Sequence, residues 1–319
     1  MSQRKIFITG ATGFIGRVVT ELAIKDGYSV RALSRKEEGD ALLKSLGATP
    51  VRGDLTSLDV LTHESASADI IFHLAFDHDF TKPYDQILAL DTAAVNALAS
   101  PLIGTNKPLI TTGGTAMVAP DPNGDETDET SPLPPNPLVP RHLAEENSLS
   151  WAAKGVRSIS IRLPQYVYGR GTASGFAALL IKLAIQSHES VYLGDGEYCT
   201  SSVHVDDAAR LYFDAAARAR PGDVFNGTAN TDTTYKEIAT AVGTAAQVPV
   251  RSITAEEATA RWGPFLTAFY SIANRASNRK AVEQLGWKPE GPGLLEEITQ
   301  GSYLAVVEEF KKAQAAGKL

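Results

Sequence analysis

Short apolar runs and helical patterns alternate along the first half of the chain. Strand-like runs rich in β-branched and aromatic residues occur at 5–9, 29–33, 49–52, 69–74, 109–112 and 159–163. After the first run, Val18, Val19, Leu22 and Ala23 follow at helical spacing, and helical patterns separate most of the other runs. Strands that alternate with helices form parallel sheets through right-handed crossovers. The pattern therefore predicts an α/β fold built on a doubly wound parallel sheet.

A proline-rich stretch interrupts this alternation at residues 120–140. It contains seven of the 17 prolines of the chain and five acidic residues. Proline cannot donate the backbone hydrogen bonds of a helix or a central strand, so the stretch is predicted to be a long surface loop. Loops of this length inside a domain often serve as lids or binding loops, whereas the simpler interpretation is a solvated connector.

The alternation becomes irregular after residue 170, where loops rich in Gly, Asp and Thr lie between helical patterns. Helices are predicted near 174–187, 206–219 and 234–246. At roughly 150 residues per domain, two domains are expected. We expect the larger to cover residues 1–170, with elements of 200–235 returning to it. The smaller, partly interwoven with the first, is expected mainly over residues 171–319.

Composition narrows the class of protein. The 319 residues are 43% hydrophobic and 21% charged, with a net charge of −7, which argues against binding to nucleic acid or to a membrane surface. The single cysteine, Cys199, excludes an intramolecular disulfide and any multi-cysteine metal site, so a reduced, cytoplasmic protein is expected. His73 and His78 lack a third ligand at helical spacing, and no metal site is expected. No apolar run reaches the length of a membrane span.

Three glycines follow the first strand-like run. Gly10 permits a tight turn, Gly13 lets the backbone approach a pyrophosphate, and Gly16 lets the next helix pack against the strand. The free amides at the start of that helix attract negative charge. Strand, glycine-rich turn and helix stand in the order that a dinucleotide site requires.

Written out, the turn reads T-G-A-T-G-F-I-G, and other stretches follow it in a fixed order. These are Gly53-Asp54-Leu55, His73-Leu74-Ala75, residues 162–169, residues 203–209 and Leu285-Gly286-Trp287-Lys288-Pro289. Over essentially its whole length the chain resembles the extended short-chain dehydrogenase/reductase family, of the NAD-dependent epimerase/dehydratase type. The resemblance implies a Rossmann nucleotide domain followed by a smaller substrate-binding domain.

The resemblance also implies which residues line the cofactor. Asp54 would bond the adenine amino group and Leu55 would line the adenine, while Phe76 and the backbone near Pro164 would lie at the nicotinamide end. The complete set of expected cofactor-binding residues is Gly10, Thr12, Gly13, Phe14, Ile15, Gly16, Ser34, Arg35, Lys36, Asp54, Leu55, Leu74, Ala75, Phe76 and Pro164.

The end of the second strand bears on the choice between NAD and NADP. An acidic residue there would bond the ribose 2′-hydroxyl of NAD, but this chain has Ser34, Arg35 and Lys36. A guanidinium suits a 2′-phosphate through charge-assisted bonds. NADP is therefore expected rather than NAD, the alternative being that both cations are solvated turn residues.

The catalytic position departs from the family pattern. Reductases of this family use a tyrosine, a lysine four residues later, and a serine or threonine at the end of the fifth strand. The corresponding stretch, residues 136–146, contains no tyrosine. Either Leu138 and His142 or Pro137 and Arg141 stand in the two places, and both registers lose the phenol.

Several side chains remain as candidates for the chemistry. Arg141 could hold ribose hydroxyls or polarise a carbonyl, but it is a poor proton donor. His142 could shuttle protons, although adjacent helical residues face about 100° apart, so only one of the two is expected to reach the site. Thr112 and Thr115 supply hydroxyls near the end of the fifth strand, or else only satisfy backbone groups there.

Two further candidates lie beyond other strands. His78 stands between Asp77 and Asp79, which should favour its charged form and give an acid usable near neutral pH; loop capping is the alternative. Tyr166 follows the sixth strand and could replace the missing phenol, or could simply pack in the core. His204 belongs to a stretch that matches a structural strand-to-helix junction of the family.

These observations favour an NADP(H)-dependent oxidoreductase that reduces a small carbonyl substrate with a non-standard proton donor. Two alternatives stay open: a non-redox isomerase, lyase or cyclase on the same scaffold, and a nucleotide-binding sensor without catalysis. The expected partner is a small-molecule substrate, and the protein is expected to be a monomer or a homodimer.

Overall fold

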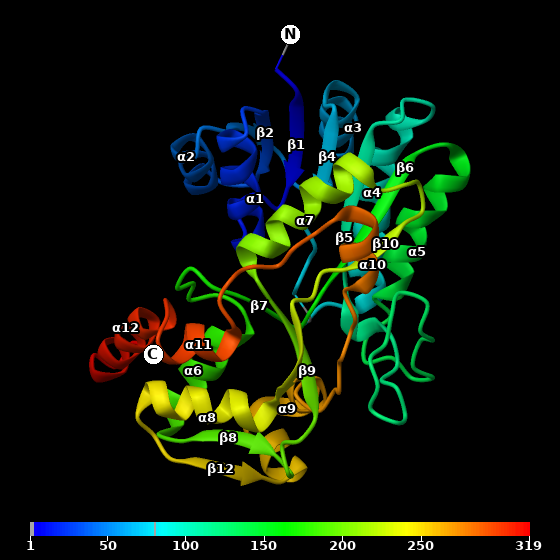
Figure 1. The fold of residues 1–319 in the computed structure, drawn as a ribbon. Coiled ribbons are helices and arrows are strands. Elements are labelled where there is room, and N and C mark those ends of the chain that lie inside the picture. Colours follow the sequence, from blue (N-terminus) through cyan, green and yellow to red (C-terminus); the bar gives the residue numbers. More distant parts are fainter. Residues whose placement is uncertain (1–2, 80) are drawn as a thin grey trace.

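A parallel sheet forms the centre of the computed structural model, which describes residues 3–79 and 81–319 (Figure 1). Within these residues the sheet has seven strands in the order β10-β6-β5-β4-β1-β2-β3, with parallel pairing throughout. Its strands are β1 (Lys5–Thr9), β2 (Ser29–Ser34), β3 (Thr49–Arg52), β4 (Ile70–His73), β5 (Pro108–Gly114), β6 (Arg157–Leu163) and β10 (Val224–Asn226).

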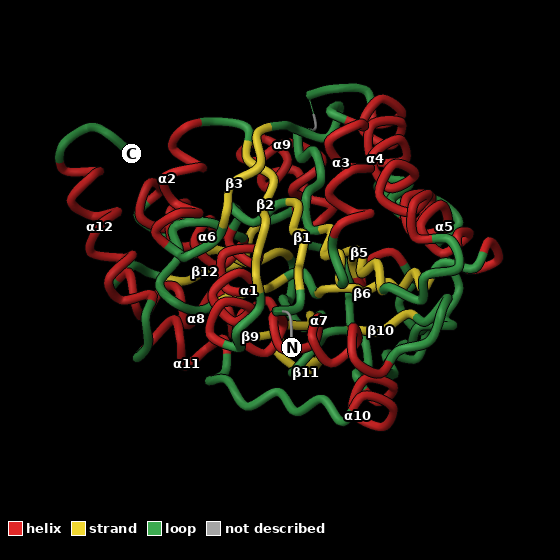
Figure 2. The backbone as a smooth tube through the Cα atoms, turned by 90° about the horizontal axis from the view of Figure 1, so that it is seen from above, coloured by secondary structure: helices red, strands yellow, loops and turns green. Residues whose placement is uncertain are grey.

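Helices cover both faces of this sheet (Figure 2). Helices α1 and α7 pack against each other on one face, and α3, α4 and α5 follow one another on the other. The helices of this region are α1 (Phe14–Lys25), α2 (Glu37–Ser45), α3 (Leu58–Ser67), α4 (Tyr84–Ala99), α5 (His142–Ser150) and α7 (Val205–Arg218). Short 3₁₀ helices follow at η1 (Ser100–Leu102), η2 (Thr115–Met117) and η3 (Trp151–Lys154).

The rest of the chain surrounds a second apolar core, to which α6, α8, α11 and α12 contribute. Its strands are β7 (Tyr166–Tyr168), β9 (Cys199–His204) and β11 (Asn230–Thr234) in one small sheet, and β8 (Ser190–Leu193) with β12 (Val250–Ile253) in another. The helices around it are α6 (Phe176–Ser187), α8 (Tyr235–Ala246), α9 (Ala255–Phe269), α11 (Leu294–Thr299) and α12 (Tyr303–Ala315). Helix α10 (Arg279–Leu285) packs instead against α7 and β10, in the core of the central sheet. Helix α9 bends at Gly263, whose φ is +78°.

The elements expected from the hydrophobic pattern are confirmed. Each predicted strand is present with ends that differ by no more than two residues, and the helices predicted in the second half correspond to α6, α7 and α8. The predicted fold class, a doubly wound parallel sheet, is correct. Helix α7 and strand β10 lie on the central sheet although they come late in the chain, with β10 pairing in parallel with β6.

The proline-rich stretch is a loop, as predicted, and it is held to the C-terminal half of the chain. The backbone of Thr127 exchanges hydrogen bonds with the chain at Arg275 (2.9 Å) and Ser277 (2.8 Å). Further along the loop, the Glu129 carboxylate accepts a hydrogen bond from the backbone amide of Asn226 at 2.7 Å. The loop is therefore tied to β10 and to the segment before α10.

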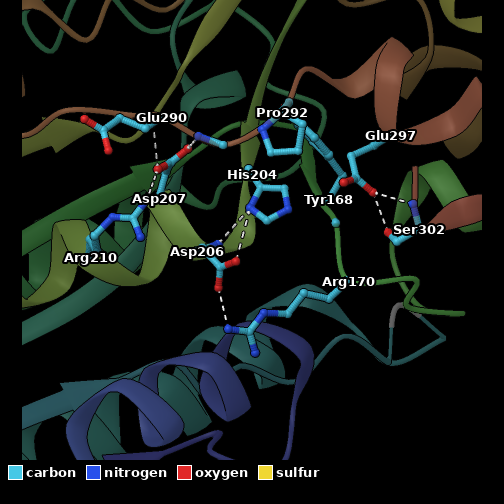
Figure 3. A network of polar contacts seen from close by, with 12 residues as sticks. Tyr168, Arg170, His204, Asp206, Asp207, Arg210, Glu290, Pro292, Glu297 and Ser302 are labelled. Carbon is cyan, nitrogen blue, oxygen red and sulfur yellow. Dashed lines mark hydrogen bonds and ion pairs between the residues drawn. The ribbon is translucent and has the colours of Figure 1, made fainter. Parts of the chain in front are cut away.

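Charged residues at the start of α7 connect the central sheet to C-terminal segments (Figure 3). The buried Asp207 carboxylate accepts from the backbone amide of Gly291 at 2.8 Å. Asp206 forms an ion pair with Arg170 at 2.5 Å, and the same guanidinium contacts a carboxylate of α1. The His204 side chain accepts from the Asp206 amide and caps α7. The strand-to-helix junction expected here is confirmed.

Among the helices of the described residues, none combines the length and apolar character needed to cross a bilayer.

We predict that Gly16→Ala destabilises the protein, because a Cβ at this position would lie 2.1 Å from the carbonyl oxygen of Gly10. The expected loss in the free energy of unfolding is about 1–3 kcal/mol, the usual cost of overpacking. Gly293→Ala is the matched control, since a Cβ there meets no described atom within 4 Å. Urea denaturation of the two variants measures the difference, and equal midpoints would contradict the packing argument.

Candidate cofactor and active site

The glycine-rich turn leaves the start of α1 open to an anion. Gly10 has a φ of +77°, and a Cβ on it would lie 2.7 Å from the Ala75 nitrogen, so the residues after β4 pass directly over the turn. Gly13 is the N-cap residue of α1, and among the described residues no side chain caps that end. The first amides of the helix are therefore available to a phosphate group.

The end of β2 and the first turn of α2 lie beside the glycine-rich turn. A Cβ on Gly39 would lie 2.7 Å from Ser34 Oγ and 3.2 Å from Thr12 Cγ2, so these side chains surround one small space. Arg35 and Lys36 are exposed at its edge. The two cationic residues directly follow Ser34 in the chain.

Asp54 follows β3 and makes a tight local turn. Its Oδ1 accepts from the Thr56 amide at 2.8 Å and from the Thr56 hydroxyl at 2.6 Å, and these hydrogen bonds lower the pKa of the carboxyl group. The other carboxylate oxygen remains as a possible acceptor for an amino group.

A buried polar chain supports the residues after β4. Thr9 Oγ1 lies 2.7 Å from His73 Nδ1, and His73 Nε2 lies 3.3 Å from Asp91 Oδ1 on α4. The Thr9 hydroxyl also accepts from the Ala75 amide at 3.3 Å. These contacts fix the turn over Leu74 and Ala75. Asp91 was not predicted from the sequence, although a carboxylate on the buried face of a helix was the available signal.

Arg141 points into the space between β4 and β5. Its guanidinium stacks on the Phe76 ring, 3.2 Å from the ring centroid, and its Nη2 donates to the Thr112 carbonyl oxygen at 2.9 Å. Nη1 is buried and has no hydrogen-bond partner within the described part of the chain. Burial lowers the pKa of Arg141, while the nearby Asp91 and Tyr84 favour its charged form.

A small cavity of about 10 Å³ adjoins this guanidinium. Polar residues from five elements line it, among them His73, Asp91, Thr112, Glu145 and Ser160. A polar space of this size corresponds to about one water molecule. Arg141 is thus one of the residues that line a small polar space.

A buried ion pair fixes the helix that follows Arg141. Glu145, one helical turn further along, accepts from Arg162 Nη2 at 2.6 Å and from the Ser160 hydroxyl at 2.6 Å. The Arg162 and Glu145 side chains are only 9% and 7% exposed. A Cβ on Gly113 would lie 3.1 Å from Glu145 Oε2, so the fifth strand carries a glycine where the helix approaches. This pair holds the first turn of α5 on β5 and β6.

The two threonine candidates already have partners. Thr112 Oγ1 donates to the His73 carbonyl oxygen at 3.0 Å and lies 2.8 Å from the Tyr212 hydroxyl on α7. The buried Thr115 hydroxyl donates to Asn274 Oδ1 at 2.6 Å. Thr112 lies beside Arg141, whereas Thr115 faces the C-terminal segment. Tyr212 was not predicted from the sequence. It lies on α7, 100 positions after Thr112, and approaches Thr112 only when α7 packs against the central sheet.

The environment of His78 differs from the sequence-based expectation. Its ring packs edge-on against Phe76, with centroids 5.5 Å apart. Burial and the charge of Arg141 lower the pKa of His78, and the opposing effect of Asp77 is smaller. The prediction that neighbouring carboxylates favour the charged imidazole is therefore wrong, because burial and the charge of Arg141 outweigh Asp77, whose carboxylate also pairs with Lys82 at 2.7 Å.

Tyr166 and His142 lie in different surroundings. Tyr166 is fully buried in the second core, and burial raises the pKa of its phenol well above the ordinary value. Its hydroxyl has no partner among the described residues. His142 is half-buried at the first position of α5. Pro164 is buried directly after β6, at the same edge of the sheet as Phe76.

Comparison with known proteins identifies relatives. The sequence model of the NAD dependent epimerase/dehydratase family matches residues 6–226. An uncharacterized protein of Schizosaccharomyces pombe is 38% identical over 299 residues, which cover 94% of this chain and 99% of its own. A 4-hydroxy-2-methyl-3-oxo-4-farnesyl-3,4-dihydroquinoline-1-oxide ketoreductase of Stigmatella aurantiaca is 27% identical over 69% of this chain and 67% of its own. The structure of a UDP-glucose 4-epimerase from Thermotoga maritima superposes with a TM-score of 0.75 at 22% identity, covering 97% and 99% of the two chains.

We predict that Glu145→Gln lowers the free energy of unfolding by about 3–5 kcal/mol, because it leaves the buried Arg162 charge without its counter-charge. Glu146→Gln, at the exposed neighbouring position, is the matched control and should change stability by less than about 0.5 kcal/mol. Removing both charges with Glu145→Met and Arg162→Met should cost less than Glu145→Gln alone. Chemical denaturation distinguishes these cases; equal stabilities of the two glutamine variants would refute the role of the pair.

Proposed function

Because the chain belongs to the NAD dependent epimerase/dehydratase family of extended short-chain dehydrogenases/reductases, we propose that it is an NADP(H)-dependent oxidoreductase that reduces a small carbonyl compound. The observation that carries this proposal is the buried guanidinium of Arg141, whose Nη1 has no partner within the described residues. The similarity to a ketoreductase supports carbonyl reduction as the reaction.

The residues around the glycine-rich turn fit a dinucleotide. The close approach of Ala75 to Gly10 and the uncapped start of α1 make a cradle for a pyrophosphate. Arg35 and Lys36 would contact a ribose 2′-phosphate beside Ser34, which favours NADP over NAD. When bound, the reduced cofactor supplies the hydride. Asp54, Leu55, Leu74 and Pro164 would complete the site.

Arg141 takes the electrostatic role in this proposal. A carbonyl oxygen that gains negative charge near Phe76 would accept a hydrogen bond from Nη1, while Nη2 stays bound to the Thr112 carbonyl oxygen. A preorganised donor in a buried setting stabilises developing charge more strongly than water does. The stacked Phe76 ring and the Thr112 bond restrict the guanidinium to one orientation.

We propose that solvent water donates the proton that the oxygen of the reduced carbonyl takes up. His78 is mainly neutral at pH 7 because burial and Arg141 lower its pKa, and Tyr166 is a weak acid because burial raises its pKa. His142, Thr112 and Thr115 have no place in the proton transfer that we propose. Arg141 would therefore act by charge and position, without giving up a proton itself.

The first test follows NADPH oxidation by the purified protein against a panel of aldehydes and ketones. Arg141→Met should lower kcat by about 10²-fold or more, the usual effect of removing such a donor, with little change in the affinity for NADPH. Arg220→Met, an exposed arginine away from the site, is the matched control. Tight NADPH binding without turnover of any carbonyl would overturn the reductase proposal and favour a non-redox enzyme or a nucleotide sensor.

The second test concerns cofactor choice. Arg35→Glu should reverse the preference from NADP to NAD, because a carboxylate repels the 2′-phosphate and can bond a 2′-hydroxyl. Lys25→Glu makes the same change of charge at the far end of α1 and should leave the preference unchanged. Dissociation constants for NADPH and NADH from fluorescence titration give the ratio. An unchanged ratio in Arg35→Glu would refute the charge argument.

A further inference from the structure

A second, much larger cavity lies in the C-terminal half of the chain. Its volume is about 400 Å³, and it is lined by residues of α6, β8, α8 and α9 and by Tyr270. Small-molecule sites commonly occupy about 300–1,000 Å³, and a dry cavity of about 150 Å³ is enough for benzene. Within the described residues, this cavity shares no lining residue with the small one beside Arg141.

The walls of this cavity are mostly apolar. Leu180, Leu183, Ala184, Leu193 and Ala239 come from α6, β8 and α8 and supply aliphatic surface. The bent helix α9 adds aromatic surface from residues on either side of its bend, because Trp262 precedes Gly263 and Tyr270 follows the last turn. The rings of Trp262 and Tyr270 meet edge-to-face with centroids 5.7 Å apart.

The charges at the cavity are already neutralised. Arg261 and Glu189 line it and pair with each other at 2.7 Å. Arg251 contacts Glu189 at 2.6 Å, and Arg261 contacts Glu257 at 2.6 Å, so each charge in the group has an opposite partner. A charged ligand would have to compete with these pairs. The cavity therefore favours a neutral occupant.

Most polar side-chain atoms on the walls are also occupied. The Ser190 hydroxyl donates to the Ala239 carbonyl oxygen at 2.7 Å, and the Tyr235 hydroxyl lies 3.0 Å from the Ile272 carbonyl oxygen. Tyr270 is the exception: it is only 4% exposed, and its hydroxyl has no partner within the described part of the chain. A buried donor without a partner is unfavourable, and a ligand oxygen would relieve that cost.

We propose that this cavity binds a neutral, apolar molecule of about two rings that carries one oxygen, and that the oxygen accepts a hydrogen bond from the Tyr270 hydroxyl. The site goes beyond the proposed reductase chemistry, because it needs neither the cofactor nor Arg141. One wall is connected to the expected nicotinamide end: the Tyr235 hydroxyl lies 3.2 Å from Gln165 Oε1, and Gln165 directly follows Pro164.

The test uses cofactor-free protein and three naphthalenes of similar shape, titrated by isothermal calorimetry. 2-Methoxynaphthalene, which has an ether oxygen and no reducible carbonyl, should bind measurably. 2-Ethylnaphthalene, which lacks the oxygen, should bind about 10-fold more weakly, the effect of one hydrogen bond. The anionic 2-naphthoate should bind more weakly still. Absence of binding by 2-methoxynaphthalene, or equal affinity for the anion, would overturn the proposal.

Variants locate the site. Tyr270→Phe should weaken 2-methoxynaphthalene about 10-fold and leave 2-ethylnaphthalene unchanged, whereas Tyr198→Phe, an exposed tyrosine outside the cavity, should affect neither. Ala239→Leu should fill space and weaken both ligands. If Tyr270→Phe bound 2-methoxynaphthalene as tightly as the unmodified protein does, the hydrogen bond that we propose would be overturned.

Thermal unfolding of the ligand-free variants supplies an independent check. Tyr270→Phe should keep or raise Tm, because its hydroxyl loses no bond in the fold. If Tyr270→Phe lowered Tm and also removed the difference in affinity between 2-methoxynaphthalene and 2-ethylnaphthalene, the hydroxyl would stabilise the fold and would not bind a ligand. Because none of these measurements uses NADPH, failure of this proposal is distinguishable from failure of the reductase proposal.

Discussion

The buried ion pair between Glu145 and Arg162 is the constraint on which the candidate active site depends. It joins α5 to β6 where both side chains are largely buried, so breaking the pair would leave a buried charge without its partner and the helix is held in one position on the sheet. That position requires Gly113 in the fifth strand, because a side chain there would meet the Glu145 carboxylate. Arg141 lies one helical turn before Glu145, so the ion pair also holds Arg141 over the Phe76 ring.

The site therefore combines a familiar cofactor cradle with an unusual group beside it. Gly10 and the open start of α1 suit a pyrophosphate, and the His73–Asp91 chain steadies the turn that crosses them. The unusual group is the Arg141 guanidinium, which is stacked on Phe76 and whose buried Nη1 has no hydrogen-bond partner among the described residues. A charge fixed in this way can stabilise an oxygen without titrating near neutral pH.

Local sequence patterns were enough to predict the sheet, its helices and the glycine-rich turn, since each rests on periodicity within a few neighbouring residues. They failed for His78, whose pKa is set in part by Arg141, some sixty positions later in the chain. They also missed Tyr212 and the Tyr270 cavity, which form only when late helices pack against earlier elements. Strand β10, three residues long, carried too short a pattern to predict.

The most direct test of the central claim is the pH dependence of kcat/KM for carbonyl reduction at saturating NADPH, measured from pH 6.5 to 9.5. If Arg141 stabilises the oxygen and water supplies the proton, the profile stays flat, because a guanidinium keeps its charge across this range. A falling alkaline limb with an apparent pKa inside the range would show that a titratable side chain delivers the proton, and would contradict the account.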